Sequence, residues 1–318
     1  MIEIFLASLT SNTLALVQLL LIALAGAILV RTRVFKSSDV KGLTLIMVNV
    51  LLPSMIFSKI VGSFDPKSFP LWWTLPLVGI GLIVVGLVFA ILFFYKDLSA
   101  KRSLLPLASM QNAGYLALPL GMAIYPTQFD LYALYTFLII MGLNPILWSV
   151  GKFLSTGGQL VAFSWKQFIT PPFIANLLGI TFVLTGFHHS IPKIVFNAIE
   201  LTGTATVPIA NFILGAVLGS ISLKIWPPFS DIIRILSVKF LIIPLVAIFV
   251  MLLINLKATN SLLSDVILIQ AATPPAIAIL IQIKNYGGDA QKSGSMMLIS
   301  YVFCVLAIPV WMALWKVM

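Results

Sequence analysis

Apolar positions gather in long uninterrupted runs along this chain. Ten stretches of at least 17 residues lack Asp, Glu, Lys and Arg; they are 4–30, 42–58, 68–95, 103–129, 131–151, 167–192, 201–223, 240–256, 266–283 and 293–315. A helix needs about 20 mostly apolar residues to cross a bilayer core about 30 Å thick. The runs lack the alternation of membrane β-strands. They therefore predict ten transmembrane α-helices.

Composition supports an all-α integral membrane protein. Of 318 residues, 60% are hydrophobic and 9% are charged, and the mean hydropathy is +1.12. A soluble domain carries roughly 25% charged residues, because its surface faces water. This chain has too few charges to cover a globule, so we expect membrane lipid to surround it.

Basic residues predict how the chain lies in the membrane. Fourteen of the nineteen lie in the odd-numbered connections: Arg31, Arg33, Lys36, Lys41, Lys96, Lys101, Arg102, Lys152, Lys166, Lys224, Arg234, Lys239, Lys284 and Lys292. The positive-inside rule then places these connections in the cytoplasm and both termini outside, as expected in a bacterial inner (plasma) membrane. The net charge of +10 is dispersed among short groups, and nucleic acids bind continuous basic surfaces. Nucleic acid is therefore not an expected partner.

Catalytic and metal-binding patterns are weak. Cys304 is the single cysteine, and the adjacent His188 and His189 have no third ligand near them in sequence, so a loop is favoured over a metal site. The chain has no G-x-x-x-x-G-K-[ST] motif for a nucleotide. Paired acids and a Ser/His arrangement are also missing from the runs. We expect no cofactor, no metal and no enzymatic activity.

The proline pattern indicates an internal repeat. Pro53 and Pro208 are 155 residues apart, as are Pro119 and Pro274. An odd number of spans in each half inverts one half relative to the other, and inverted repeats place substrates near the membrane midplane. The prediction is a first five-helix repeat over residues 1–151, a cytoplasmic linker over 152–167 and a second repeat over 168–318. Coincidence is the alternative, because prolines are common in membrane helices.

Polar residues interrupt the fourth and ninth runs. The fourth contains Gln111, Asn112, Gly114, Pro119 and Gly121, which predict an unwound stretch from about Asn112 to Pro119. The ninth repeats the design, with the residues Gln270, Thr273, Pro274 and Pro275. Half-helix N-termini and amides at two such breaks would form an anion site built from dipoles. Two kinked helices whose amides bond neighbouring backbones are the alternative.

Other polar groups have structural explanations beside functional ones. Asn144 in the fifth run and Asn211 in the seventh either bind a ligand or join two helices, as intramembrane amides commonly do. Lys59, Glu200 and Asp265 flank runs two, seven and nine. Snorkelling toward the membrane surface is their ordinary explanation.

Five segments resemble the auxin efflux carrier family, which includes plant auxin carriers and bacterial relatives that move dicarboxylates such as malate or malonate. They are NVLLPSMIF (49–57), NAGYLALPLGMAIYP (112–126), PPFIANLLGI (171–180), VPIANFILGAVLGS (207–220) and ATPPAIAILIQIKNYGGD (272–289). The likeness extends over nearly the whole chain. The short connection at mid-chain is similar to the bacterial branch and argues against auxin as the substrate.

The resemblance implies two inverted five-helix repeats, with broken helices four and nine crossing at Pro119 and Pro274. It implies an elevator-type carrier of carboxylates, in which spans one, two, six and seven form the scaffold. Asn112 and Asn144 match the family's site, and Gln111, Gly114, Thr273 and Gln270 complete our predicted substrate-binding set. Substrate, coupling ion (proton or sodium), direction of transport and oligomeric state, including a homodimer, stay open. A sodium-coupled symporter, a ligand sensor without transport and an intramembrane enzyme are the alternatives.

Overall fold

The computed structural model describes residues 1–156, 169–221, 225–286 and 289–318. Over these residues the chain is 86% helical and contains no strands, so the all-α prediction is confirmed. Most of the predicted linker lies outside the described residues, as do Lys166, Lys224 and the two glycines of the YGGD segment.

The first half of the described chain contains nine α-helices. They are α1 (Ile2–Arg31), α2 (Ser37–Ile46), α3 (Leu52–Ser63), α4 (Leu75–Phe94), α5 (Leu98–Lys101), α6 (Leu105–Ser109), α7 (Leu118–Ile124), α8 (Phe129–Ile146) and α9 (Lys152–Ser155). Three π-helical turns interrupt them: η1 (Met47–Leu51), η5 (Ala113–Ala117) and η7 (Leu147–Gly151). Four 3₁₀ turns join helices: η2 (Trp72–Thr74), η3 (Tyr95–Asp97), η4 (Arg102–Leu104) and η6 (Pro126–Gln128).

The second half of the described chain also contains nine. They are α10 (Pro171–Leu184), α11 (Lys193–Thr204), α12 (Thr206–Gly219), α13 (Phe229–Ser237), α14 (Ile243–Leu253), α15 (Leu256–Thr259), α16 (Ser261–Ala272), α17 (Ile277–Tyr286) and α18 (Ala290–Val317). The turn η9 (Phe187–Ser190) is 3₁₀ and η10 (Val238–Ile242) is π-helical. Both histidines lie in η9, in the connection where we expected them.

Seven helical stretches of the described residues are long and apolar enough to cross a membrane. They are Ile2–Arg31, Ser38–Ser63, Trp72–Ser109, Pro126–Ser155, Lys193–Gly219, Phe229–Leu253 and Ala290–Val317. The shorter apolar helices Ala113–Ile124, Pro171–Leu184 and Ser261–Ala272 coincide with the remaining predicted runs. Seven spans therefore meet the length criterion, and the full ten-span architecture stays a prediction.

Three π turns have a common local cause. The π turns η1, η5 and η10 end at Leu51, Ala117 and Ile242. Two residues after each end comes a proline: Pro53, Pro119 and Pro244, respectively. A proline in a helix lacks the N–H donor and its ring presses on the carbonyl one turn earlier. A widened turn before each proline relieves that clash.

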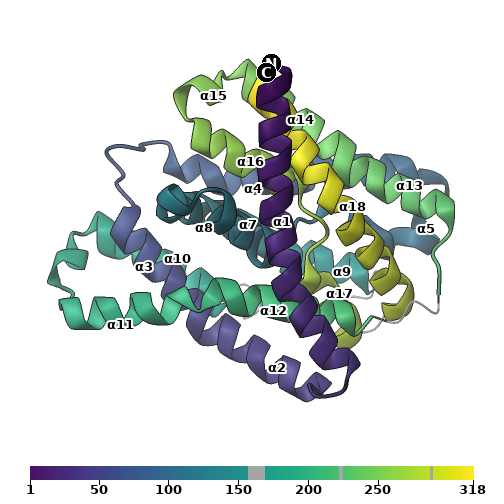
Figure 1. The fold of residues 1–318 in the computed structure, drawn as a ribbon, viewed down its shortest axis with the longest axis horizontal. Helices are drawn as coiled ribbons and strands as arrows, with labels where there is room; N and C mark the ends of the chain where they lie inside the picture. Colours follow the sequence, from purple (N-terminus) through teal and green to yellow (C-terminus); the bar gives the residue numbers. More distant parts are fainter. Residues whose placement is uncertain (157–168, 222–224, 287–288) are drawn as a thin grey trace.

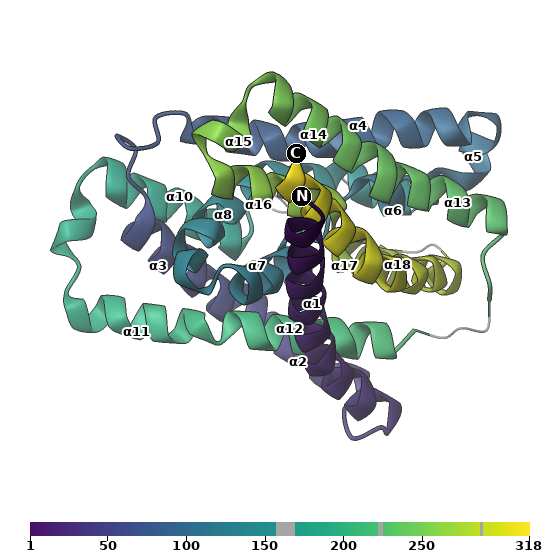
Figure 2. The ribbon, with the colours of Figure 1, turned by 45° about the horizontal axis from the view of Figure 1, so that its top comes forward.

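Helices α1 and α12 cross in close contact (Figures 1 and 2). A Cβ added to Gly215 would lie 1.6 Å from the carbonyl oxygen of Ala23, and one added to Gly26 would lie 2.2 Å from that of Phe212. Small residues let membrane helices approach this closely, which maximises their van der Waals contact. The Asn211 amide adds a hydrogen bond of 2.8 Å to the Leu19 carbonyl, so Asn211 joins two helices.

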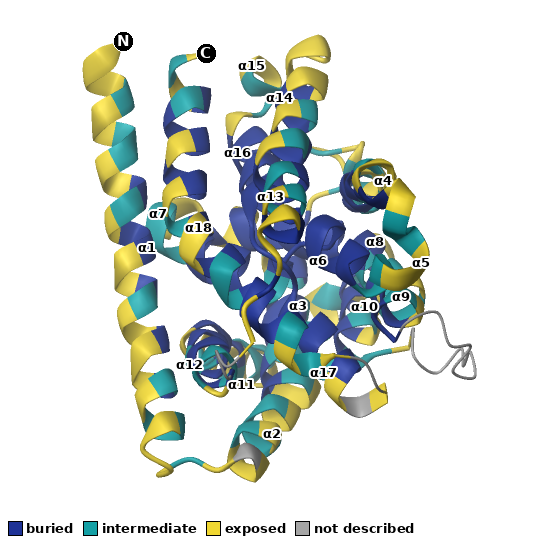
Figure 3. Ribbon diagram, turned by 90° about the vertical axis from the view of Figure 1, so that its right-hand side faces the viewer, coloured by how far each residue is buried: buried dark blue, intermediate teal, exposed yellow. Residues whose placement is uncertain are grey.

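Burial separates a lipid-facing periphery from a protein-filled centre. Every residue of α16 from Leu262 to Ala272 is buried, whereas α1 exposes most of its length (Figure 3). Helices that are apolar all round are expected in such a centre. The half-helices that carry the predicted breaks therefore lie where lipid does not reach.

Charged groups form two separate sets of ion pairs. In one, the Lys59 ammonium lies 2.8 Å from Asp130 and 3.2 Å from Glu200. The other contains Lys101 with Asp97 at 2.6 Å, Lys101 with Asp231 at 2.7 Å, Arg234 with Asp97 at 3.1 Å and Lys292 with Asp231 at 3.3 Å. Among the described residues no ion pair joins the two sets. Each set draws only on connections that the sequence assigns to one side of the membrane.

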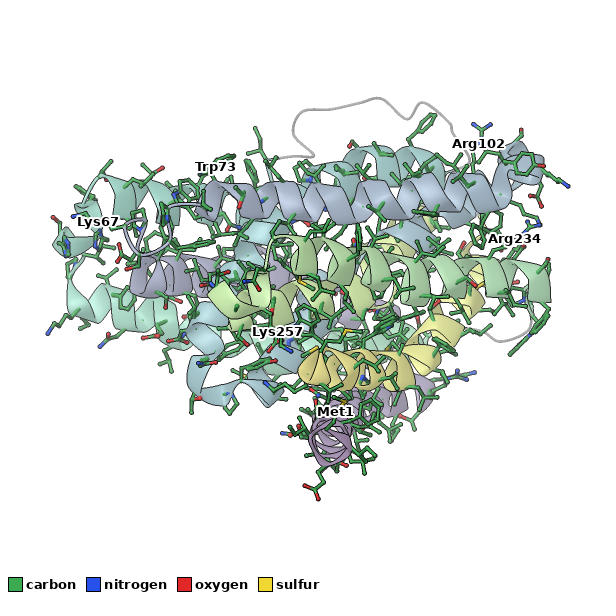
Figure 4. All side chains as sticks on the ribbon, turned by 90° about the horizontal axis from the view of Figure 1, so that it is seen from above. Met1, Lys67, Trp73, Arg102, Arg234 and Lys257 are labelled. Atoms are coloured by element: carbon green, nitrogen blue, oxygen red, sulfur yellow. The ribbon has the colours of Figure 1, made fainter. Side chains whose placement is uncertain are left out.

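The ends of the molecule agree with this separation. Lys67 lies at the opposite end from Arg102 and Arg234 (Figure 4), and the sequence assigns these residues to opposite sides. Both termini lie close together, at the top of Figures 1 and 3.

Candidate functional site

The two broken helices meet at a short main-chain bridge. The Asn112 N–H donates to the Pro274 carbonyl at 2.9 Å, and the Ala276 N–H donates to the Met110 carbonyl at 3.1 Å. Gln111 and Pro275 therefore face each other as an isolated antiparallel pair. They form a non-hydrogen-bonded pair, in which neither residue needs an N–H. A proline is accordingly tolerated at 275.

This bridge corrects the predicted position of the first break. Residues Met110–Asn112 separate α6 from η5, and helical turns resume at Ala113. The unwound stretch is thus shorter and earlier than the predicted Asn112–Pro119. Pro119 lies in the first turn of α7, because the π turn before it already accommodates the ring. Of the two predicted crossover prolines, only Pro274 lies at the bridge.

A cavity of about 260 Å³ opens beside the bridge. It is bounded by the first break and η5, by the α2–α3 and α8–η7 segments, by α4, by the start of α10 and by the start of α17. Its lining is mostly Leu, Ile, Val, Phe and Ala; the polar or amphipathic lining residues are Thr44, Gln111, Asn112, Gly114, Tyr115, Asn144, Trp148 and Thr170. None of the described lining residues is a Lys, Arg, His, Asp or Glu.

Asn112 is held from two sides. Its side-chain oxygen accepts a hydrogen bond of 3.1 Å from the Tyr115 N–H and so caps the η5–α7 segment. Its amide nitrogen donates to the Tyr301 hydroxyl, which in turn donates to the Pro275 carbonyl at 3.2 Å. An amide nitrogen carries two hydrogens, so one remains for a ligand.

Gln111 and Gly114 lie beside Asn112 on the cavity. The Gln111 side chain is 4% exposed, and neither end of its amide has a hydrogen-bond partner among the described residues. An unpaired buried amide is costly, and because Gln111 lines the cavity, its amide is available to a ligand. A Cβ added at Gly114 would meet no atom within 4 Å, so its backbone is open to the cavity.

Asn144 reaches the same cavity from α8. Its half-buried side chain lines the wall, and within the described residues it forms no hydrogen bond of its own. The alternative role, joining two helices, therefore has no support in the structure. Pro145 follows it inside the helix, and η7 comes directly after α8.

Gln270 and Thr273 lie at the end of α16 and do not line the cavity. The Thr273 hydroxyl donates to the Gln270 carbonyl at 2.9 Å. The Gln270 amide is fully buried and has no partner among the described residues. The structure thus brings together Gln111, Asn112, Gly114 and Asn144 but not these two, whose role as ligands stays a prediction.

Two half-helices begin at the cavity and point their positive ends toward it. Ala113 and Gly114 start the η5–α7 segment, and Ile277 and Ala278 start α17; all four line the cavity. First-turn N–H groups have no acceptor within their own helix. Together they produce a positive potential equivalent to a fraction of a charge at each helix start. A site without basic residues can therefore still attract an anion.

Sequence reasoning missed Tyr301 and misplaced two ionisable residues. Tyr301 lies 189 positions from Asn112, and nothing local indicates that they meet. Asp265 does not snorkel: it is 5% exposed and accepts a hydrogen bond of 2.8 Å from the Tyr125 hydroxyl. Lys239 was assigned to a connection but lies inside the Phe229–Leu253 helix, fully buried. Counting charge-free runs excluded it by definition.

The architecture and cavity are those of an integral membrane transporter. Residues 12–312 match the family model described as membrane transport protein. The chain belongs to this family, which is that of the auxin efflux carriers. The resemblance seen in the sequence is confirmed.

Two archaeal proteins are similar over nearly their whole length. An uncharacterized transporter of Methanocaldococcus jannaschii is 25% identical over 293 residues, which cover 87% of this chain and 90% of that protein. An uncharacterized transporter of Methanothermobacter thermautotrophicus is 24% identical over 306 residues, which cover 94% of this chain and 97% of the relative.

Proposed function

We propose that this protein is a secondary active transporter of small organic anions. The observation that carries the proposal is the cavity at the bridge, where the starts of two half-helices and three amide side chains converge without a basic residue. Repeat transporters bind substrates at discontinuous helices near the midplane in this way.

The proposed binding mode follows from the donors at the cavity. A carboxylate would accept hydrogen bonds from Gln111, from the free amide hydrogen of Asn112 and from Asn144, while the η5 and α17 starts stabilise its charge. Dipoles suit a carrier better than a lysine or arginine, because binding must stay weak enough for release.

The rest of the cavity lining restricts which carboxylic acids are expected to bind. Beyond the three amides the lining is mostly apolar, and its other side-chain donors are only the hydroxyl or indole groups of Thr44, Tyr115, Trp148 and Thr170. A second carboxylate, as in malate or malonate, would be buried there with few donors and no basic residue, which is costly. We therefore expect a single carboxylate with an apolar body to be preferred over dicarboxylates. Malate and malonate stay in the test as the family-derived candidates.

For the transport cycle we propose alternating access by an elevator movement of two inverted five-helix repeats, with ten spans and both termini outside. Packing supports the association of the scaffold spans, while α1 also packs on α18 of the proposed moving part. α1 packs on α12, and α3 packs on α10 and α11, which associates spans one, two, six and seven. Lys59 on α3 reaches Asp130 on α8, an exposed link across that boundary.

The test is flux into proteoliposomes of purified protein. Labelled lactate, indole acetate, malonate, malate and succinate are offered while pH, sodium and voltage gradients are imposed one at a time. We expect saturable uptake of at least one monocarboxylate, greater than that of any dicarboxylate. No flux of any acid from folded protein would overturn the proposal.

The same experiment judges the alternatives. Uptake that requires sodium would identify a sodium-coupled symporter. Saturable binding of an acid without flux would favour a membrane sensor.

A further inference from the structure

Lys239 lies at the middle of a membrane-spanning helix. It is the eleventh residue of the stretch Phe229–Leu253, and at 1.5 Å per residue it is about 15 Å from the nearer end. Its side chain is fully buried, so the amine does not reach the membrane surface by snorkelling.

The ammonium position has no partner. Among the described residues, Nζ of Lys239 forms no hydrogen bond and no ion pair. The turn η10 packs against α4, α6 and α16. α4 and α6 contain no ionisable residue, and Asp265 on α16 is bound by Tyr125.

The remaining charged groups near this helix are also occupied. Asp231 and Arg234, earlier on the same helix, form ion pairs with Lys101, Lys292 and Asp97. α18 touches the helix through Trp311, which donates to the Phe240 carbonyl. On α18, Tyr301 is bonded to Asn112, and the Cys304 thiol bonds to the Tyr301 carbonyl.

Two other lysines, Lys59 and Lys152, have groups that stabilise their charge. The Lys59 ammonium has two carboxylates within 3.2 Å. The Lys152 ammonium is 3.8 Å from the centre of the Tyr286 ring, although Lys152 is only 5% exposed. Lys239 thus differs from Lys152 in the lack of any group that would stabilise a charge.

The surroundings of Lys239 favour one of its two protonation states over the other. A buried ammonium without a counter-charge or hydrogen bonds is strongly disfavoured, whereas a neutral amine is tolerated. This conformation therefore favours the amine. A conformation that lets water reach this face of the helix would favour the ammonium. A group whose proton affinity differs between two conformations links proton binding to the conformational change.

Lys239 also lies near both broken helices, because η10 packs against α6 and α16. α6 ends directly before the first break, and α16 ends directly before the second. The packing there is close: a Cβ added to Gly86 on α4 would lie 2.7 Å from the Cα of Ser109 and 2.9 Å from Ile243. Movement of either half-helix would alter the environment of η10.

We propose that Lys239 is the proton-carrying group of this transporter, so that the coupling ion is a proton. The inference rests on the proposed transport function. In the cycle, the amine binds a proton from water on one side, forming an N–H bond, and returns it to water on the other side when that bond breaks.

The first test needs no substrate. Melting temperatures of detergent-purified protein are measured from about pH 9 to about pH 5. Wild type is expected to lose stability as pH falls, because protons bind Lys239 in the unfolded state. Lys239→Met should flatten this slope, and the control Lys152→Met should keep it. Equal slopes in wild type and Lys239→Met would overturn the proposal.

The second test separates coupling from transport. Accumulation of labelled lactate or indole acetate, whichever wild type moves, is driven by a pH gradient and compared with exchange of labelled for unlabelled acid. For Lys239→Met we expect accumulation to fall at least about tenfold while exchange stays within about twofold. Lys239→Gln serves as a second variant should Met disturb folding.

The outcomes distinguish the two proposals. Gradient-driven accumulation that is unchanged in both Lys239 variants would overturn the coupling role and leave the carrier intact. Absence of flux and exchange in wild type would overturn the transport function itself, and the coupling role with it.

Discussion

The two helix breaks are joined by one main-chain bridge but differ in where their side chains lie. At the first break, Gln111 and Asn112 lie on the cavity, and Asn112 caps the helix that follows. At the second, the Thr273 hydroxyl turns back to the Gln270 carbonyl, and neither residue reaches the cavity. The second break contributes the start of α17 and two prolines. The first break supplies side-chain donors and a helix start, whereas the second supplies a helix start alone.

This difference shows why similar sequence patterns need not form similar sites. A glutamine and a small polar residue lie at or near both breaks, whereas prolines lie only at the second. Each break requires only the loss of a few helical hydrogen bonds. Which polar groups then face a ligand depends on what packs against the break. α16 is buried along its length, so its amide faces protein.

The largest effect is expected for Asn112→Ala. The change removes a helix cap, worth about 1 kcal/mol, and a donor to a charged group, worth about 1.5–3 kcal/mol. Transport efficiency should fall between about tenfold and several hundredfold, since 1.4 kcal/mol is tenfold. Thr273→Ala is the matched control and should stay within about twofold. Flux measurements in proteoliposomes check both, and equal losses would remove the distinction between the breaks.

A second comparison concerns two asparagines in membrane helices. Asn144→Ala should raise KM about tenfold without lowering the melting temperature, because its amide has no bond to lose within the protein. Asn211→Ala should leave KM unchanged and lower the melting temperature by about 2–4 °C, since it breaks the bond to Leu19. Concentration-dependent uptake and thermal unfolding separate these effects. A stability loss in Asn144→Ala with normal KM would reverse its assignment.

The smallest effect is expected from the two buried glutamines. Gln111→Met should weaken acid binding about threefold to tenfold, because one of several donors is lost. Gln270→Met should leave affinity unchanged and keep or raise the melting temperature, since it removes an unsatisfied buried amide. Binding measured by calorimetry and thermal unfolding test the pair. Weaker binding in Gln270→Met alone would assign the ligand to the second break.

The sequence was informative wherever one physical effect dominates. Lipid exposure requires long apolar helices, so the charge-free runs located the helices. Membrane potential and anionic lipid act on lysines and arginines in connections, and the segregated ion pairs follow the charge alternation. Proline and glycine disrupt helices locally, so both breaks were predicted. The position of the first was wrong by several residues, because a π turn accommodates Pro119.

Tertiary structure decided which polar groups act together. Tyr301 meets Asn112 across 189 residues, and no local pattern records such a contact. Thr273 and Asn144 look alike in sequence as polar residues beside prolines, yet only Asn144 lines the cavity. The sequence pattern assigns Lys239 to a connection, whereas the structure places it inside a helix with its side chain buried. Periodicity and propensity are properties of neighbours along the chain, whereas hydrogen bonding, burial and dielectric environment depend on neighbours in space.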